Sequence, residues 1–289
     1  MSDAKPLIGF IGQGWIGKNY ANDFEARGYA TVRYALEEPY KANKDHIKDC
    51  DIVFIAVPTP STPSGFDASI VESAFPLIGK GKIAVVKSTI LPGTTTRFQE
   101  QNPDIVILYA PEFLSEATAA HDAAHPFSNI MGLSTDDVLH RDAANRVLSV
   151  LPDAPFTHIC SSTEAELVKY SHNMSGYVQI VLFNILYDLA QKTGADWDNV
   201  QKALAADPYI SNRYAKPVHK TGRGAGGGCF IKDMAALRML AQQIAPEDTK
   251  AIAALKAFEC KNIDLLTSSG KDLGLLKGVY GDNPEVCDS

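Results

Sequence analysis

The residue with the clearest potential for covalent chemistry is Cys229, which follows a run of glycines and small residues in GRGAGGGCF. The next residues, FIKDMAALRML, have the apolar spacing of a helix, so the thiol is expected at a helix N-terminus. The positive end of the helix dipole and the charge of Lys232 both lower the pKa of a thiol below its usual value of about 8.5. The sequence therefore predicts an attacking thiolate at Cys229, against the alternative of a buried structural cysteine.

Three polar side chains could assist such a thiolate. Asp233 follows Cys229 by four residues, which puts it one helical turn away on the same face, where a carboxylate could act as a base toward water. Lys169 and Asn173 have the same spacing in another segment, and both could donate to a developing oxyanion. Each of the three also has an ordinary role on a helix surface or at a helix end, so only their combination indicates catalysis.

A separate motif, GQGWIG, could hold a dinucleotide. It follows an uncharged apolar run, Leu7–Ile11, and opens a helix-like segment, which is the context that makes such a motif specific. The first glycine allows a tight turn, the second lets the backbone approach a pyrophosphate, and the third lets the helix pack closely on the strand. The expected cofactor contacts in this turn are Gly12, Gly14, Trp15, Ile16 and Gly17.

An acidic residue is expected about 20 residues after these glycines, where it would bind the adenosine ribose. The predicted second strand, TVRY, is followed by ALEE. We expect Glu37 to be the ribose ligand, although it comes later than a simple strand end would place it. No arginine follows this strand end, which favours NAD over NADP.

The elements around these motifs predict an α/β fold with an N-terminal Rossmann-type, doubly wound parallel sheet. Uncharged apolar runs recur, as expected for strands that are buried on both faces, and helix-like segments separate them. The strands expected after the first two are Ile52–Val57, Ile83–Val86, Ile105–Leu108, Asn129–Leu133 and Phe156–Ile159. This pattern predicts an NAD-binding domain over residues 1–160.

The remainder of the chain is expected to form an all-helical central domain, residues 161–269. From Ser162 to Thr193 there is no proline and one glycine, and the apolar spacing predicts one long helix. Its apolar content exceeds a single core-facing stripe, so part of it is expected to pack against a second subunit in a homodimer. Further helices are expected over Trp197–Ala205, Met234–Ala245 and Thr249–Leu266. Residues 270–289 are expected to be a loosely ordered tail.

Composition limits the class of protein. The hydrophobic share of 45% and charged share of 21% are typical of a globular chain, and the net charge of −7 argues against nucleic-acid binding. No apolar stretch is long enough to span a membrane and no signal pattern begins the chain, so we expect a cytoplasmic protein without a membrane partner.

Five scattered cysteines favour reduced thiols over a disulfide framework. His121 and His125 have metal-like spacing but no third ligand nearby, so no metal site is expected.

Several blocks, in order, resemble the UDP-glucose/GDP-mannose dehydrogenase family. GQGWIG resembles the family's nucleotide turn, and VPTP and VKSTILPGTT resemble its two loops around cofactor and substrate. APEFLSEATAAHD resembles its PEFLREG block, ELVKYSHN resembles the start of its central helix, and GRGAGGGCFIKDMAAL resembles its cysteine signature. The resemblance extends over nearly the whole chain.

The resemblance implies a four-electron, NAD-dependent oxidation of a nucleotide sugar such as UDP-glucose, in which a primary alcohol becomes a carboxylate through a thiohemiacetal and a thioester. It implies that Cys229 is the nucleophile and that Lys169 and Asn173 stabilise oxyanions. It assigns the handling of water and protons to Asp233, Thr89 and Glu116, and it places Glu112 in the lining of the site. The cofactor contacts that it implies beyond the glycine turn are Val57, Pro58, Thr59, Thr89 and Lys232.

This sequence departs from the family pattern at positions that would contact substrate. Residues that replace a characteristic family residue are Ser115, Ser128, Tyr209, Ala225, Gly228 and Ile231, with Arg213 as a possible substitute one turn after Tyr209. Family members usually continue into a further nucleotide-binding domain, and we interpret this chain as a compact member without it.

Two other functions stay open. A two-electron hydroxyacid dehydrogenase of the 6-phosphogluconate dehydrogenase type shares the lysine–asparagine helix pair but has no need of Cys229. A non-catalytic, truncated NAD-binding relative would keep the cofactor domain without turnover.

Overall fold

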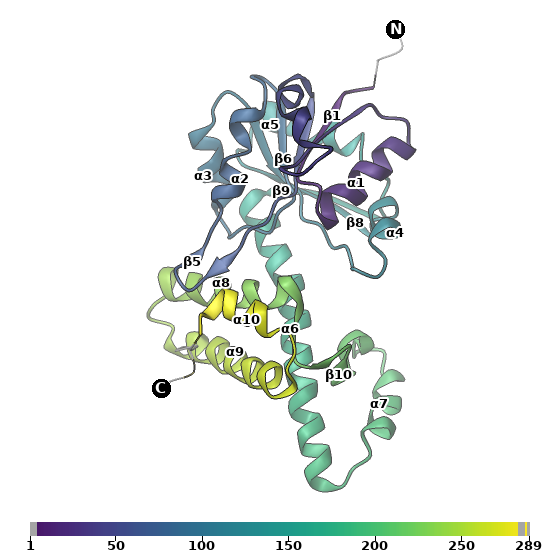
Figure 1. The fold of residues 1–289 in the computed structure, drawn as a ribbon, viewed down its shortest axis with the longest axis vertical. Helices are drawn as coiled ribbons and strands as arrows, with labels where there is room; N and C mark the ends of the chain where they lie inside the picture. The colour runs from purple at the N-terminus through teal and green to yellow at the C-terminus, as the bar shows by residue number, and fades with distance from the viewer. Residues whose placement is uncertain (1–4, 283–286, 288–289) are drawn as a thin grey trace. The chain divides into compact units, whose positions relative to one another are not determined.

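The computed structural model describes residues 5–282 and 287, and the chain divides into two compact units (Figure 1). Unit 1 contains the residues up to Thr59 together with Ala68–Lys169, and unit 2 contains Pro60–Asp67 together with the residues from Tyr170 onward. The division differs from the expected boundary at residue 160, because the first two turns of the long helix belong to unit 1. A short hairpin from the N-terminal half of the sequence belongs to unit 2. The division into units depends on contacts between distant residues, which cannot be predicted from composition along the sequence.

Unit 1 is built on a seven-stranded sheet with the strand order β2-β1-β3-β6-β7-β8-β9. Its strands are β1 (Ile8–Ile11), β2 (Thr31–Tyr34), β3 (Ile52–Ile55), β6 (Ile83–Val86), β7 (Val106–Tyr109), β8 (Ser128–Leu133) and β9 (Phe156–Ser161). The expected Rossmann-type sheet is confirmed, and every predicted strand is present to within two residues at each end. The pairing of β7 with β8 is antiparallel, whereas the other neighbours are parallel. An apolar run shows that a strand is buried but not its direction, so the sequence could not reveal this pair.

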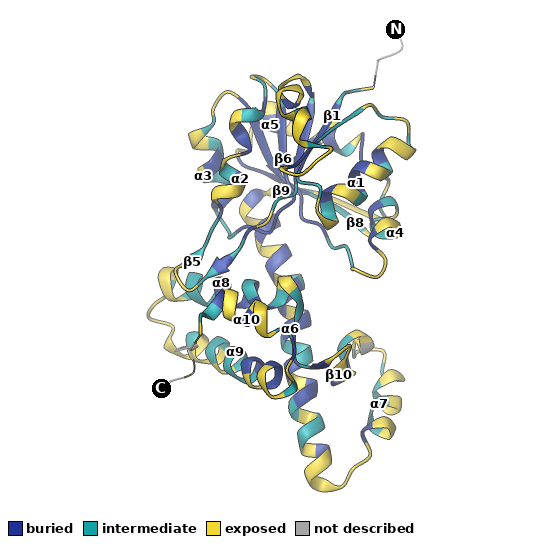
Figure 2. Cartoon of the chain, viewed as in Figure 1, coloured by how far each residue is buried: buried dark blue, intermediate teal, exposed yellow. Residues whose placement is uncertain are grey.

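Helices cover both faces of this sheet (Figure 1). They are α1 (Trp15–Ala26), η1 (Lys41–Asp49), α2 (Ser69–Glu72), η2 (Phe75–Leu77), α3 (Thr94–Gln101), α4 (Ala119–Ala124) and α5 (Val138–Leu148). One core joins the sheet to α1 and α5, and in it the rings of Phe24 and Phe54 lie 5.5 and 5.4 Å from the ring of Phe10. Figure 2 shows the strands as the buried centre of the unit. Burial of these rings on one sheet face fixes where α1 lies.

The carboxyl ends of four neighbouring strands are level with one another. In the parallel register Ile11 pairs with Ile55, Ile55 pairs with Val86, and Val86 pairs with Tyr109. The loops that follow these strands therefore begin at one edge of the sheet. In doubly wound folds this edge is where ligands bind.

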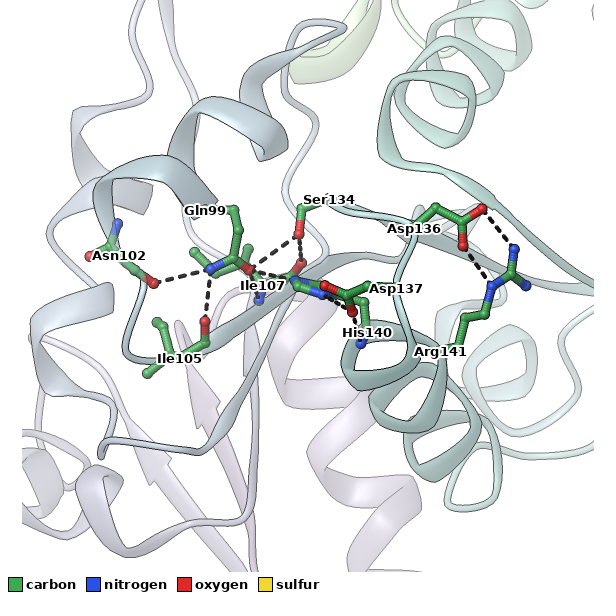
Figure 3. Close-up of polar contacts among 9 residues, drawn as sticks. All are labelled: Gln99, Asn102, Ile105, Ile107, Ser134, Asp136, Asp137, His140 and Arg141. Carbon is green, nitrogen blue, oxygen red and sulfur yellow. Dashed lines mark hydrogen bonds and ion pairs between the residues drawn. The ribbon is translucent and has the colours of Figure 1, made fainter.

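A polar network at one end of α3 ties three elements together (Figure 3). Gln99 Nε2 donates to the carbonyls of Asn102 and Ile105 at 3.1 and 2.8 Å, which fixes the orientation of the amide. Its Oε1 accepts from Ile107 N at 2.8 Å and from the Ser134 hydroxyl at 3.2 Å, and it lies 3.0 Å from Nε2 of His140. A single side chain thus satisfies backbone groups at the start of β7 and joins α3 to α5.

Unit 2 is mostly helical. Its elements are the second part of α6 (Ser162–Thr193), α7 (Trp197–Ala205), η3 (Asn212–Tyr214), α8 (Gly227–Ile244), α9 (Thr249–Ser269), α10 (Leu273–Tyr280) and the hairpins β4 (Ser61–Thr62) with β5 (Gly65–Phe66) and β10 (Val218–His219) with β11 (Gly222–Arg223). The predictions of α6 and α7 are confirmed at both ends. Helix α8 begins seven residues before the expected Met234, at Gly227, because apolar spacing does not extend into its glycine-rich first turn. None of the helices in residues 5–282 combines the length and apolarity that a membrane crossing requires.

Two expectations about the C-terminal residues are wrong. Residues Leu273–Tyr280 form a helix, α10, whose Leu276 and Val279 are buried against α8 and α9, and so the described part of the tail is packed. Cys260 and Cys287 form a disulfide, with their Cα atoms 5.4 Å apart, so these two cysteines are not reduced thiols. Both features arise from contacts between distant residues, which neither glycine content nor cysteine spacing could indicate. Residues 283–286, 288 and 289 of the expected tail lie outside the described residues.

Candidate active site

The glycine turn after β1 has the geometry that a dinucleotide requires. Gly12 has a φ of +92°, and a Cβ there would lie 2.3 Å from the carbonyl oxygen of Ala56. A Cβ on Gly17 would lie 1.9 Å from the carbonyl oxygen of Gly12, so close packing of helix on strand also demands glycine. Gly14 is the N-cap of α1, and a Cβ there would meet nothing within 4 Å. The turn leaves open space at the N-terminus of α1, where backbone N–H groups and the helix dipole attract a pyrophosphate.

A cleft of about 710 Å³ opens at this helix N-terminus. It is lined by Gln13, Gly14, Trp15, Lys18, Asn19 and the residues from Glu116 to His121. Trp15 is 53% exposed, as a side chain at a cleft wall can be, whereas Ile16 packs against the core and does not line the cleft. Lys18 and Asn19 are wall residues that sequence reasoning missed. Their signal was available, because they follow Gly14 by four and five residues on the first turns of α1.

The two loops after β3 and β6 are bound to each other. The Ser88 hydroxyl donates to the carbonyl of Val57 at 2.7 Å and accepts from its N–H at 2.9 Å. The Thr59 hydroxyl donates to the carbonyl of Thr89 at 2.8 Å. Thr59 and Thr89 are buried and Pro58 is exposed. The structure therefore brings together the predicted cofactor residues Val57, Pro58, Thr59 and Thr89 at the carboxyl edge of the sheet.

Glu37 lies beyond the end of β2, in a turn. Tyr34 ends the strand, and Glu37 is three residues further on, with its side chain exposed. Its carbonyl accepts from the N–H groups of Tyr40 and Lys41 at 3.1 and 3.2 Å. Its role as a ribose ligand stays a prediction.

A buried pair of opposite charges lies in unit 1. Lys169 Nζ donates to Glu112 Oε1 at 2.9 Å and to the carbonyl of the same residue, and both side chains are at least nine-tenths buried. Glu112 Oε2 also accepts from Leu114 N at 2.9 Å. Lys87 lies near the pair, and burial lowers its pKa to about 8. Two of the predicted catalytic residues are thus in direct contact, whereas Glu116 is exposed and lines the cleft beside the glycine turn.

A second charged group lies in unit 2. Asp233 is 1% exposed, and its Oδ2 accepts from Asn173 Nδ2 at 2.7 Å while its Oδ1 accepts from Lys232 Nζ at 2.6 Å. Lys232 is held in turn through its carbonyl, which accepts from the Ser61 hydroxyl at 2.9 Å. Both oxygens of the predicted base are therefore occupied by donors from α6 and α8.

Cys229 differs from the other free cysteines, Cys50 and Cys160, in exposure. It is the third residue of α8 and is exposed, which argues against a buried structural role. Burial raises the pKa of the Cys50 thiol to about 12 and that of the partly buried Cys160 thiol to about 11. A low thiolate content is thus expected at Cys50 and Cys160 near neutral pH, and the exposed thiol lies at the helix N-terminus that the sequence predicted.

The helix α6 carries donors for both charged groups. Lys169 is the last α6 residue of unit 1, and Asn173, one turn later, belongs to unit 2. A metal site was not expected from the sequence. Among the described residues no group of three His, Cys, Asp or Glu side chains could hold a metal ion. His121 and His125 instead stack with ring centroids 4.5 Å apart.

Comparisons with known proteins place the chain in a family. Residues 30–147 match the NAD binding domain, and residues 163–258 match the central domain, of the UDP-glucose/GDP-mannose dehydrogenase family. A UDP-glucose 6-dehydrogenase of Rhizobium meliloti is 32% identical over 213 residues, which are 69% of this chain and 48% of that protein. The chain spans about half the length of such curated relatives.

Solved structures agree with the fold. A UDP-glucose dehydrogenase of Pyrobaculum islandicum superposes with a TM-score of 0.77 at 26% identity, over 91% of this chain and 69% of that one. A 3-hydroxyisobutyrate dehydrogenase of Mycobacterium tuberculosis has a TM-score of 0.67 at 16% identity, over 94% of this chain and 98% of that one, and shares the fold alone. The two family matches cover most of the strands of the sheet and nearly all of the central helix α6, and the chain belongs to the UDP-glucose/GDP-mannose dehydrogenase family.

Proposed function

We propose that this protein oxidises the primary alcohol of a nucleotide sugar of the UDP-glucose type to the uronic acid, through a thiohemiacetal and a thioester on Cys229. The observation that carries the proposal is the exposed thiol in the first turn of α8, four residues before a buried carboxylate that two donors hold. The family membership and the glycine turn support NAD as the oxidant. The turn of Gly12, Gly14 and Gly17 would hold NAD, which when bound would supply the oxidising chemistry as a hydride acceptor in each of the two oxidations.

Side chains of the protein carry out the covalent, oxyanion-stabilising and hydrolytic steps of the proposed reaction. The Cys229 thiolate adds to the carbonyl carbon of the aldehyde, which forms the C–S bond and places a negative charge on oxygen. Lys169 and Asn173 are donors suited to stabilise that charge. After the second oxidation a water attacks the thioester carbon, one of its protons passes to Asp233, and the C–S bond breaks to release the thiolate and the carboxylic acid, which gives its remaining proton to solvent to become the carboxylate. We assign Thr89 and Glu116, together with Asp233, to the handling of water and protons, and Glu112 to the lining of the site.

The homodimer belongs to the same proposal. Leu182, Leu186 and Leu189 on α6 are 44%, 40% and 53% exposed, and their spacing puts them on one helix face within unit 2. Such a row of exposed leucines favours a second copy of the chain as its partner.

A panel of UDP- and GDP-sugars with NAD tests the activity, read as NADH formed per sugar consumed. Two NADH per sugar are expected from the wild-type protein. In Cys229→Ser or Asp233→Asn we expect the rate to fall by at least about 100-fold, since each change removes a group that acts in the covalent steps. Asp233→Asn should accumulate a covalent adduct on Cys229 that mass spectrometry detects. A yield of one NADH per sugar would contradict the four-electron reaction.

A second candidate is a two-electron hydroxyacid dehydrogenase. The favouring observation is that the chain covers nearly the full length of a hydroxyacid dehydrogenase fold and carries a lysine and an asparagine one turn apart on its central helix. This reaction does not use a thiol, so Cys229→Ala would turn over small hydroxyacids as fast as the wild-type protein does. Loss of all NADH formation in Cys229→Ala would exclude it.

A further inference from the structure

The glycine loop before Cys229 is held by a segment to which the proposed mechanism gives no role. This segment is the connection between α9 and α10, which contains Lys271 and Asp272. Asp272 Oδ2 accepts from Gly227 N at 2.8 Å, and Lys271 Nζ donates to the carbonyl of Gly224 at 2.9 Å. Both contacts lie inside unit 2. The loop that leads to the thiol is therefore bound at two points by residues more than 40 positions later in the chain.

The glycines of the loop are what permits this approach. A Cβ on Gly226 would lie 2.0 Å from Asp272 Oδ2 and 2.8 Å from Lys271 Cε. Lys271 is 6% exposed, so its ammonium group is enclosed where it meets the loop. The absence of a side chain at Gly226 therefore leaves room for the Asp272 carboxylate, which accepts from the first N–H of α8.

The backbone of Asp272 is also unusual. Its φ is +54°, in the left-handed region that glycine, asparagine and aspartate adopt more readily than other residues. This conformation starts α10 and is compatible with the bond from Asp272 to Gly227. Aspartate and asparagine combine an acceptor side chain with tolerance of the left-handed region, so either residue suits this position.

We propose that Asp272, supported by Lys271, is a positioning residue for the thiol of Cys229, an inference that rests on the function proposed above. Gly227 is the first residue of α8 and Cys229 the third, so the bond to Asp272 holds the turn that carries the sulfur. A held first turn keeps its N–H dipoles aligned, and aligned dipoles stabilise a thiolate. Asp272 acts through the helix end and does not touch the substrate.

The charged groups around this turn come from three segments of the chain. Lys271 and Asp272 belong to the α9–α10 connection, and burial lowers the pKa of Lys271 while Asp272 opposes that effect. Lys232 and Asp233 belong to α8 and form an ion pair with each other. Lys220, which precedes β11, acts on Lys271 as a like charge. A test must therefore separate the hydrogen bond of Asp272 from its charge.

Two variants make that separation. Asp272→Asn removes the charge but keeps an acceptor and tolerates the left-handed backbone, whereas Asp272→Gly removes both charge and acceptor and tolerates the same backbone. Alkylation of Cys229 by iodoacetamide is followed against pH by peptide mass spectrometry, with Cys160 as an internal reference. We expect the midpoint pH of Cys229 alkylation to be about half a unit higher in Asp272→Gly than in Asp272→Asn, because the helix-end stabilisation of the thiolate is lost. Equal midpoints in the two variants would overturn the proposal.

A second measurement covers the case in which Asp272→Gly does not fold. Lys271→Met fills similar space but cannot donate to Gly224, and amide hydrogen exchange from Gly227 to Phe230 should then be about fivefold faster than in the wild-type protein. Unchanged exchange would also overturn the proposal. Both measurements use the full chain without cofactor or sugar, so they report on positioning even if the sugar panel yields no NADH.

Discussion

Glu166 is a buried carboxyl whose ionisation should affect stability. It accepts from the N–H groups of Gly93 and Thr95 at 2.6 and 2.8 Å and from the Thr95 hydroxyl at 2.6 Å, yet burial raises its pKa from 4.5 to about 7. A carboxyl with a raised folded-state pKa stabilises the fold below pH 4.5 and loses that contribution as the pH rises through 7. Relative to Glu166→Gln, the free energy of unfolding of the wild-type protein should fall by up to about 3 kcal/mol across this range.

Urea unfolding of both proteins at several pH values between 4 and 8 measures this difference. Glu100→Gln is the matched control, because Glu100 is exposed on α3, the helix that Glu166 caps. The free energy of unfolding of Glu100→Gln should depend on pH in the same way as that of the wild-type protein. If the free energies of unfolding of the wild-type protein and Glu166→Gln differed by the same amount at every pH, Glu166 would not titrate in this range.

At the scale of elements, Gln99 is the side chain that joins α3 to β7 and α5 (Figure 3). Gln99→Ala leaves the Ile107 N–H and two carbonyls without their partner, and each such loss costs about 1 kcal/mol or more. We therefore expect the free energy of unfolding to fall by about 2–3 kcal/mol, as measured by urea unfolding. Gln101→Ala, at the exposed end of the same helix, should change it by less than about 0.5 kcal/mol. Equal effects of the two substitutions would mean that helix propensity, and not the network, sets the stability of α3.

At the scale of the whole molecule, the exposed leucines of α6 test the proposed homodimer. Replacing both Leu182 and Leu186 by Glu puts two like charges on each proposed contact face, and the dimer should dissociate with a loss of at least about 100-fold in affinity. Sedimentation of the wild-type and variant proteins over a range of concentrations measures this change. Leu139→Glu is the control, since Leu139 is 62% exposed on α5, outside the proposed contact. Sedimentation of the wild-type protein as a monomer at every concentration would refute the homodimer.

The sequence by itself determined the features that depend on local patterns. The strands of the Rossmann sheet, the full length of α6 and the glycine turn at Gly12–Gly17 were predicted because burial period and glycine spacing are properties of neighbouring residues. The helix-end location of Cys229 was predicted for the same reason, and the family resemblance is confirmed by the matches to both domains.

Only the tertiary structure decided which distant groups meet. Lys169 bonds Glu112 across 57 residues and Asn173 bonds Asp233 across 60, and neither partner could be read from helix spacing. The antiparallel β7–β8 pair, the packed helix α10 and the disulfide of Cys260 with Cys287 were missed for the same reason. Direction and partner choice depend on how apolar faces bury one another, so a local pattern can require that a group be buried without fixing what it is buried against.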